Sequence, residues 1–353
     1  MNDVGSEPSI VPSFHRSGVL VIQTAFLGDV VLTTPLLSAL ARRHGAVDVV
    51  ATTAAASLLE THPAVASVIR YDKHGSARGW VGFRKLAAQM RARRYAAVYL
   101  PHRSVRSAAL ALWSGAPERI GFADAPAAIT YTSRIPRPST GHEVERLLAL
   151  AGPGQASPPV ALELTAADQA QAEAWLAAHG VRGGFVALAP GSIWGTKRWP
   201  YYRELAGVLT TTLVIVGGED DAPLARDIIT AAPGRVFSAA GALTLRASAA
   251  LIQRATALVT NDSAPLHLAT AVGTPIVAVF GPTVPEFGFG PRRPGDIVLG
   301  HAGLACRPCS KHGPRACPLG HHRCMRELSV ETVAAAVMTA ARMEEPGEIC
   351  PRN

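Results

Sequence analysis

One stretch of the sequence, a short helix between two apolar strands, constrains the fold most. Residues 258–260 are apolar or β-branched and predict a buried strand, and residues 276–280 predict a second one. Asp262 or Ser263 can cap the helix between them, and Gly273 can end it. The start of such a helix presents uncapped backbone N–H groups and the positive end of its dipole. The unit therefore predicts a site for an anion, most commonly phosphate.

The same alternation of apolar strands and helices runs through the rest of the chain. Further strands are expected at 19–23, 47–52, 67–71, 97–100, 185–189 and 212–216. Helices are expected at 31–43, after a turn at 27–29, and at 54–62, 80–93, 103–115, 201–210, 222–231, 245–254 and 330–343. Strands that alternate with helices predict mostly parallel sheets that are covered on both faces.

The chain has 353 residues, which is long enough for two domains. A Pro-, Gly- and Ser-bearing stretch at 151–159 predicts a linker. The expected parts are a flexible N-terminus (1–17), a first domain (18–155), a second domain (156–327) with a Cys/His-rich segment (301–324), a closing helix (328–345) and a tail (346–353). Two doubly wound domains in tandem predict a ligand crevice between them, at the carboxyl ends of the strands.

The net charge of +8 predicts an anionic partner. Aromatic residues make up only 6% of the chain and are not interleaved with arginine runs, which argues against nucleic acid. No apolar run reaches the roughly 18 to 20 residues that span a bilayer. Residues 1–17 lack the apolar stretch of a secretory signal, so we expect a cytoplasmic protein.

Four motifs occur in the order of a known family. They lie at 27–35 (LGDVVLTTP), at 189–192 with 197–200 (APGS and KRWP), at 216–220 (VGGED) and at 262–283. Together they resemble the lipopolysaccharide heptosyltransferases of glycosyltransferase family 9, and within it the heptosyltransferase II group. The resemblance covers nearly the whole chain. It implies the GT-B fold, an α/β architecture in which two Rossmann-like domains face each other across a cleft.

The resemblance also implies an activity. The first domain would bind the acceptor, and the second would bind the donor, ADP-L-glycero-D-manno-heptose. Transfer would invert the anomeric centre and require no bound metal or other cofactor. The acceptor would be the lipid-anchored inner core of lipopolysaccharide, which implies an enzyme at the inner face of the cytoplasmic membrane. We expect a monomer.

Asp29 follows Gly28 at the first predicted strand-to-helix turn, where a simple helix cap would also explain it. The resemblance implies that Asp29 is the general base, because the acceptor hydroxyl must lose its proton as it attacks the anomeric carbon. Gly28, His102, Arg103 and Arg106 are candidates for acceptor binding, because the family's acceptor carries phosphate and carboxylate groups. Further arginines of this basic lip are Arg119, Arg134 and Arg137.

A transferase without a metal must stabilise the leaving diphosphate with protein groups. The candidates for this role are Thr196, Lys197, Asp262, Ser263, Ala264 and His267. A loop lysine is more often solvated, and a histidine in a first helical turn is more often packed. The chain departs from the family pattern at Ala264, where glycine is typical, and we expect its backbone to avoid positive φ. Glu219 or Asp220 would contact the ADP ribose, or else form the acidic first turn of the next helix.

Four cysteines, Cys306, Cys309, Cys317 and Cys324, have the spacing C-x2-C-x7-C-x6-C. This spacing is compatible with zinc or a cluster but matches no standard ligand pattern. Disulfides are not expected in a cytoplasmic protein. Similar residues occur in the tails of the family resembled, so the segment supports the resemblance more than it supports a metal.

Two alternatives stay open. The same double fold could belong to a nucleotide-sugar-binding or epimerising protein, or to a GT-B transferase with another donor sugar. A dinucleotide oxidoreductase is disfavoured, because no G-x-G-x-x-G follows the first strand.

Overall fold

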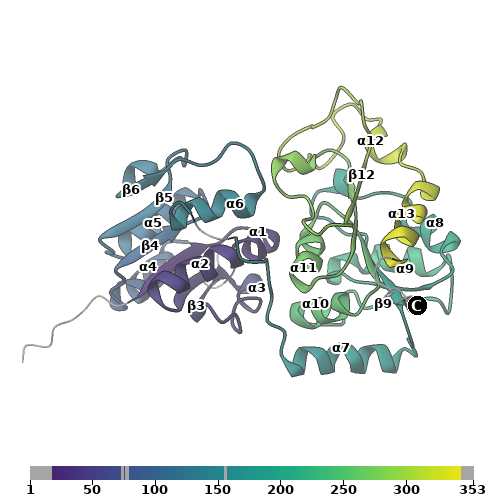
Figure 1. The fold of residues 1–353 in the computed structure, drawn as a ribbon, viewed down its shortest axis with the longest axis horizontal. Coiled ribbons are helices and arrows are strands. Elements are labelled where there is room, and N and C mark those ends of the chain that lie inside the picture. Colours follow the sequence, from purple (N-terminus) through teal and green to yellow (C-terminus); the bar gives the residue numbers. More distant parts are fainter. Residues whose placement is uncertain (1–17, 73–74, 76–78, 155–156, 343–353) are drawn as a thin grey trace, which may run out of the picture.

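The computed structural model describes residues 18–72, 75, 79–154 and 157–342. It contains two lobes, each built around a parallel six-stranded sheet (Figure 1). The expected flexible N-terminus at 1–17, the tail at 346–353 and the last residues of the expected closing helix lie outside the described residues.

The first sheet has the strand order β3-β2-β1-β4-β5-β6. Its strands are β1 (Val19–Gln23), β2 (Val47–Thr52), β3 (Val65–Tyr71), β4 (Ala97–Leu100), β5 (Glu118–Phe122) and β6 (Ser133–Ile135). Its helices are α1 (Leu27–Leu32), α2 (Thr34–His44), α3 (Thr53–Ala56), α4 (Gly79–Ala92), α5 (Val105–Trp113) and α6 (Glu143–Leu148).

The second sheet repeats this topology in the order β12-β11-β10-β7-β8-β9. Its strands are β7 (Phe185–Ala189), β8 (Thr212–Ile215), β9 (Val236–Ser238), β10 (Ala257–Asn261), β11 (Ile276–Phe280) and β12 (Ile297–Gly300). Its helices are α7 (Ala166–Ala178), α8 (Tyr202–Val208), α9 (Ala222–Ile229), α10 (Leu245–Gln253), α11 (Ala264–Val272), α12 (Arg323–Arg326) and α13 (Val330–Arg342). The two doubly wound sheets confirm the expected α/β, GT-B class of fold.

Both sheets have a topological switch point, where the strand order reverses and ligand sites of such sheets form. In the first sheet it lies between β1 and β4, and in the second between β7 and β10. The loop after β1 leads into α1, and the loop after β10 leads into α11. Figure 1 shows α1 and α11 facing each other between the lobes. The topology therefore brings the predicted base and the predicted anion site to one interface.

Two local expectations were wrong. The turn at 27–29 is helical, and Thr33 separates α1 from α2, where its hydroxyl donates a 2.7 Å hydrogen bond to the carbonyl of Asp29. The helix expected at 54–62 ends at Ala56 and continues as tight turns with i→i−3 backbone hydrogen bonds. Several elements had no clear signal in the sequence. The edge strands β6 and β9 have only three residues each, and the many alanines of α7 leave no strong apolar stripe.

The lobes share part of their apolar interior. One continuous hydrophobic core contains side chains of α1 and α2 in the first lobe together with Leu266 and Leu268 of α11 in the second. Because this core continues across both lobes, their relative position is stabilised by the same apolar burial that stabilises each lobe.

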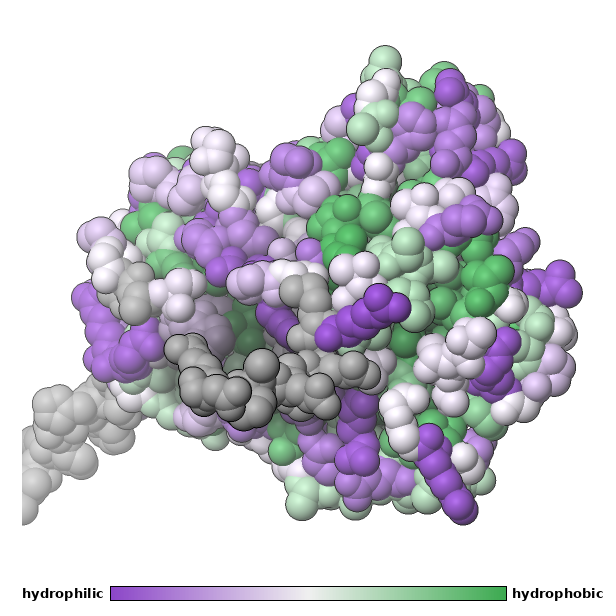
Figure 2. Space-filling model, turned by 45° about the vertical axis from the view of Figure 1, so that its right-hand side comes forward, coloured by the Kyte–Doolittle hydropathy of each residue, from purple (hydrophilic) through white to green (hydrophobic). Residues whose placement is uncertain are grey.

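On the outer surface seen in Figure 2, hydrophilic side chains are widespread and hydrophobic ones form smaller areas between them.

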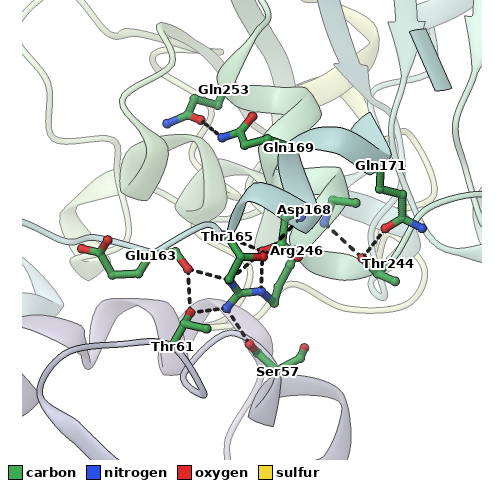
Figure 3. Close-up of polar contacts among 11 residues, drawn as sticks. Ser57, Thr61, Glu163, Thr165, Asp168, Gln169, Gln171, Thr244, Arg246 and Gln253 are labelled. Carbon is green, nitrogen blue, oxygen red and sulfur yellow. Dashed lines mark hydrogen bonds and ion pairs between the residues drawn. The ribbon is translucent and has the colours of Figure 1, made fainter. Parts of the chain in front are cut away.

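A second contact between the lobes centres on Arg246 of α10 (Figure 3). Its Nε and Nη2 donate to Asp168 Oδ2 of α7 at 2.9 and 2.6 Å. Nη1 donates to the carbonyl of Ser57 at 3.1 Å and to Thr61 Oγ1 at 2.5 Å, both in the first lobe. Nη2 also donates to the carbonyl of Glu163, in the segment between α6 and α7 that joins the lobes, at 2.6 Å. One buried guanidinium thus holds both lobes and the chain between them.

Replacement of Arg246 by Ala should therefore loosen the junction. It would remove the cation that faces Asp168 and one donor from each of two carbonyls, so we expect a loss of about 3 kcal/mol in the free energy of unfolding. The hydrogen bonds from Thr165 to Asp168 and from Thr61 to the carbonyl of Glu163 would remain. Arg246 holds the pKa of Asp168 at about 2, so the pair stabilises fully above about pH 4 and loses its effect as the pH falls through about 2. Urea unfolding of wild type and variant between pH 7 and pH 2 measures both effects.

Arg254→Ala is the matched control, because Arg254 follows the same helix and pairs with Glu173 of α7 at 2.8 Å in an exposed ion pair. An exposed pair contributes at most about 1 kcal/mol. Equal losses in the two variants would contradict the role assigned to Arg246.

Candidate functional site

A cleft of about 460 Å³ lies between the lobes. In the first lobe, the residues that line the cleft follow β1 and β4 or belong to α6 and the segment before it. In the second lobe, they follow β11 and β12. The lining side chains with polar groups include Gln23, Asp29, His102, Arg103, Arg137, Ser139, Glu143, Arg146, Glu286, Lys311 and His312. The cleft is rich in ionisable groups and suits a highly polar ligand.

Asp29 lies in the first turn of α1 and lines this cleft. Burial and the nearby charge of Glu143 raise the pKa of Asp29 to about 6, against the opposing effect of Arg137. A carboxylate with this pKa is largely ionised at neutral pH and still accepts a proton readily. Asp29 therefore has the properties of a general base.

Glu143, at the start of α6, is the centre of a buried charge cluster. Its carboxylate accepts a hydrogen bond from Arg137, and its Oε2 lies 3.6 Å from Nη1 of Arg146. Arg146 also donates to the carbonyl of Phe287 in the second lobe at 2.6 Å. The cluster compensates the charge of Glu143 and ties one wall of the cleft to the opposite lobe.

His142, the N-cap of α6, strengthens the same junction. Its Nε2 donates to the carbonyl of Gly290 in the second lobe at 3.0 Å, and its Nδ1 accepts from the backbone N–H of Val144 at 3.2 Å. Burial lowers the pKa of His142 to about 4, so the ring is neutral and this pattern of one donor and one acceptor persists at neutral pH.

Gly28 is buried and does not line the cleft. A Cβ atom at this position would collide with Cδ2 of His267 on α11 and lie 3.2 Å from its Nε2. The observed role of Gly28 is therefore close packing of the two lobes, whereas the sequence suggested acceptor binding. Glycine is required here because α1 directly approaches the edge of the imidazole ring at Cδ2.

The start of α11 carries two buried polar atoms that have no hydrogen-bond partner among the residues the structure describes, Oγ of Ser263 and Nδ1 of His267. The sequence suggested that Asp262 or Ser263 caps this helix. Ser263 is the N-cap residue, but neither side chain caps the helix. Ala264 takes the first helical position without positive φ, as expected. Because buried polar groups are normally paired, these two atoms indicate a ligand at this helix start.

Lys197 and Asp262 form a buried ion pair at 2.6 Å beside the helix start, and Thr283 donates to the same carboxylate oxygen at 2.7 Å. The lysine is thus held by Asp262 and is not a solvated surface charge. Thr196 is buried, and its hydroxyl donates to the carbonyl of Pro314, so this hydroxyl is engaged by the Cys/His-rich segment.

The acidic residues after β8 agree with the second of the two expectations, an acidic turn that leads into the next helix, α9. Glu219 and Asp220 are exposed in a 3₁₀ turn (Glu219–Asp221), and neither lines the cleft. Asp221 instead turns inward, accepts a 3.0 Å hydrogen bond from the N–H of Gly218 and packs against Gly191. The sequence did not single out Asp221, although it stands beside the two candidates.

The candidates for acceptor binding divide into two groups. His102 and Arg103 line the cleft, and Arg103 pairs with Asp124 at its rim. Arg106 and Arg134 are exposed and do not line it, and Arg119 donates to two backbone carbonyls near β5. The sequence missed Glu143 and Arg146 because no separate motif marks the short helix that carries them.

The four cysteines of the Cys/His-rich segment are free thiols. Within the described part of the chain, no group of three or more His, Cys, Asp or Glu side chains is placed to hold a metal ion. The zinc alternative therefore gains no support from the structure.

Comparison with known proteins identifies the family. Residues 83–319 match the model of glycosyltransferase family 9 (heptosyltransferase). Lipopolysaccharide heptosyltransferase 2 of Escherichia coli K12 is 27% identical over 298 residues, which cover 76% of this chain and 84% of that protein. Lipooligosaccharide heptosyltransferase 2 of Haemophilus influenzae is 36% identical over 112 residues, which cover 29% of this chain and 32% of that protein.

Solved structures agree with these matches. The glycosyl transferase family 9 structure from Veillonella parvula has a TM-score of 0.82 and 25% identity, and the match covers 93% of this chain and 98% of that chain. E. coli ADP-heptose LPS heptosyltransferase II has a TM-score of 0.77 and 24% identity, with 93% and 99% covered. The second similarity supports the fold alone.

The tight contact at Gly28 yields a prediction. Gly28→Ala should push α1 away from His267, lower the free energy of unfolding by about 1 to 3 kcal/mol and widen the cleft. Gly207→Ala is the control, because Gly207 is also helical and a Cβ there meets nothing within 4 Å. Urea unfolding should show a gain of about 0.5 to 1 kcal/mol for the control. A gain for both variants would contradict the packing role of Gly28.

Proposed function

The chain belongs to glycosyltransferase family 9, the heptosyltransferases, and we propose that this glycosyltransferase moves L-glycero-D-manno-heptose from ADP-L-glycero-D-manno-heptose to the inner core of lipopolysaccharide. The observation that carries the proposal is that α1, whose Asp29 lines the cleft, packs through Gly28 against His267 at the start of α11, where two buried polar atoms have no partner among the described residues. A base on one lobe and an anion site on the other are the two elements that a glycosyl transfer without a metal needs.

The second lobe binds the donor in this proposal. The N–H groups at the start of α11 and the hydroxyl of Ser263 donate to the diphosphate. Burial lowers the pKa of His267 to about 4, so its imidazole is neutral and acts through a hydrogen bond. Lys197 provides an ammonium group beside this helix start, and Asp262 fixes its position and balances its charge. Charge that develops on the leaving ADP is stabilised where it forms.

The first lobe binds the acceptor. Arg103, Arg137 and His102 lie along the cleft, where they can bind phosphate or carboxylate groups of a core saccharide. Asp29 accepts the proton of the acceptor hydroxyl while its oxygen bonds to the anomeric carbon and the bond from that carbon to ADP breaks. A single displacement from the opposite face inverts the anomeric centre.

Asp29→Asn tests the base. We expect kcat to fall by about 10²- to 10⁴-fold, because asparagine cannot accept the proton, while ADP binding changes by less than about twofold. In the wild type, kcat/KM should fall tenfold for each pH unit below about pH 6, because protonation removes the base. Initial rates with ADP-heptose and a core acceptor measure both effects.

Glu143→Gln separates this role from a structural one. Loss of the negative charge removes one cause of the raised pKa of Asp29, so the acid limb of the pH profile should move to lower pH. An unmoved limb, or substantial turnover by Asp29→Asn, would remove Asp29 from the role of base.

The donor nucleotide can be tested separately. ADP should raise the melting temperature of the full chain more than UDP or GDP at equal concentration, because the ligand with the lowest Kd stabilises the folded state most, by RT ln(1 + [L]/Kd). Differential scanning fluorimetry measures this shift. A clear preference for UDP or GDP would overturn the donor assignment.

A further inference from the structure

An exposed aromatic and basic face lies on α4 and α5 of the first lobe, outside the cleft. Trp80 is 61% exposed and Val81 81% exposed on α4, and Trp113 is 41% exposed at the end of α5. Isolated exposed apolar residues are common, but a group of them on two neighbouring helices marks an interaction surface. We call these three side chains, with Val105 and Leu112 of α5, the aromatic face.

The aromatic rings of this face are held in place before any partner binds. Trp80 stacks on the buried Phe83 with ring centroids 5.4 Å apart, and it meets Trp113 edge-on at 5.2 Å. Phe83 and Trp113 lie 5.6 Å apart. Little rotamer freedom would be lost on docking, and indole rings prefer the boundary between apolar and aqueous phases.

The stretch of chain that carries the aromatic face contains charges of one sign. Residues 73–117 contain nine Lys or Arg and no Asp or Glu. Asp48 and Asp124, from outside this stretch, pair with Arg93 and Arg103. Arg84, Lys85 and Arg91 on α4 are exposed and take part in no ion pair with another described residue. Exposed indole rings flanked by unpaired cations match the chemistry of an anionic bilayer surface.

The aromatic face also continues into the acceptor side of the cleft. α5 begins at Val105, two residues after Arg103, which lines the cleft, and Val105 is 59% exposed. No helix within the described ranges is long and apolar enough to cross a membrane. A face of this kind would instead hold the enzyme on the membrane, with the acceptor side of its cleft toward the lipid surface.

We infer that the α4–α5 face docks the enzyme onto the surface of an anionic phospholipid bilayer. The inference deepens the proposed function, because a lipid-anchored acceptor must be reached at that surface. The expected partner is lipid and not a protein, since exposed cations and aromatic rings lie together on this face and residues 73–117 contain no acidic side chain.

Val81→Asp tests the docking in the full chain. Val81 is almost fully exposed, and an aspartate in the first turn of α4 favours the helix dipole, so folding should be retained. In flotation with vesicles of phosphatidylcholine and phosphatidylglycerol, the variant should partition at least about tenfold more weakly than wild type. Arg84→Gln with Lys85→Gln should lower partitioning about fivefold for each charge. Vesicles of phosphatidylcholine alone should bind the wild type weakly.

Val208→Asp is the matched control, because it places the same charge at a 55% exposed valine on α8 of the other lobe. It should leave partitioning within about twofold of wild type. Equal losses in the two valine variants, or no binding of the wild type to anionic vesicles, would overturn the inference. So would a wild-type dimer that Val81→Asp dissociates, because the face would then bind protein.

Transfer assays distinguish this inference from the proposed function. Val81→Asp should transfer heptose at the wild-type rate to an acceptor freed of its acyl chains, and more slowly to an acceptor embedded in anionic vesicles. A wild type inactive on both acceptors would contradict the proposed function, while the flotation result would still decide the docking.

Discussion

The contact between α1 and α11 is the constraint on which the site depends. It joins the switch points of two separate sheets, and it exists because residue 28 has no side chain in the space that the His267 ring occupies. The shared apolar core stabilises the same contact. The distance between Asp29 on one lobe and the start of α11 on the other is thus set by close packing, which changes little without cost.

The charges around Asp29 in the cleft are largely paired with one another. Glu143 is compensated by Arg137 and Arg146. Burial and the negative charge of Glu143 raise the pKa of Asp29 and together outweigh the effect of Arg137. The environment keeps one carboxylate easy to protonate while the surrounding ions remain paired, which is how a single side chain acquires acid–base reactivity at neutral pH.

The sequence allowed prediction of the fold class and most buried strands, because parallel strands such as β7 and β11 are continuous apolar runs. It also led to Asp29, Ser263 and His267, which lie at ends of such strands or at starts of helices. It did not predict that Gly28 packs on His267 or that Thr196 donates to Pro314, because both contacts join residues more than 100 positions apart. The role of Glu143 depends likewise on the placement of Asp29 and Arg137 in space, which no local pattern encodes.

Many of the hydrogen bonds that Arg246 makes at the junction between the lobes go to main-chain oxygen atoms. The guanidinium binds carbonyls at positions 57 and 163, whose side chains take no part in these contacts. Related chains can therefore vary at these two positions during evolution and keep the same junction, provided that the arginine and its carboxylate partner are inherited together. Sequence conservation alone would then underestimate how many residues the junction contains.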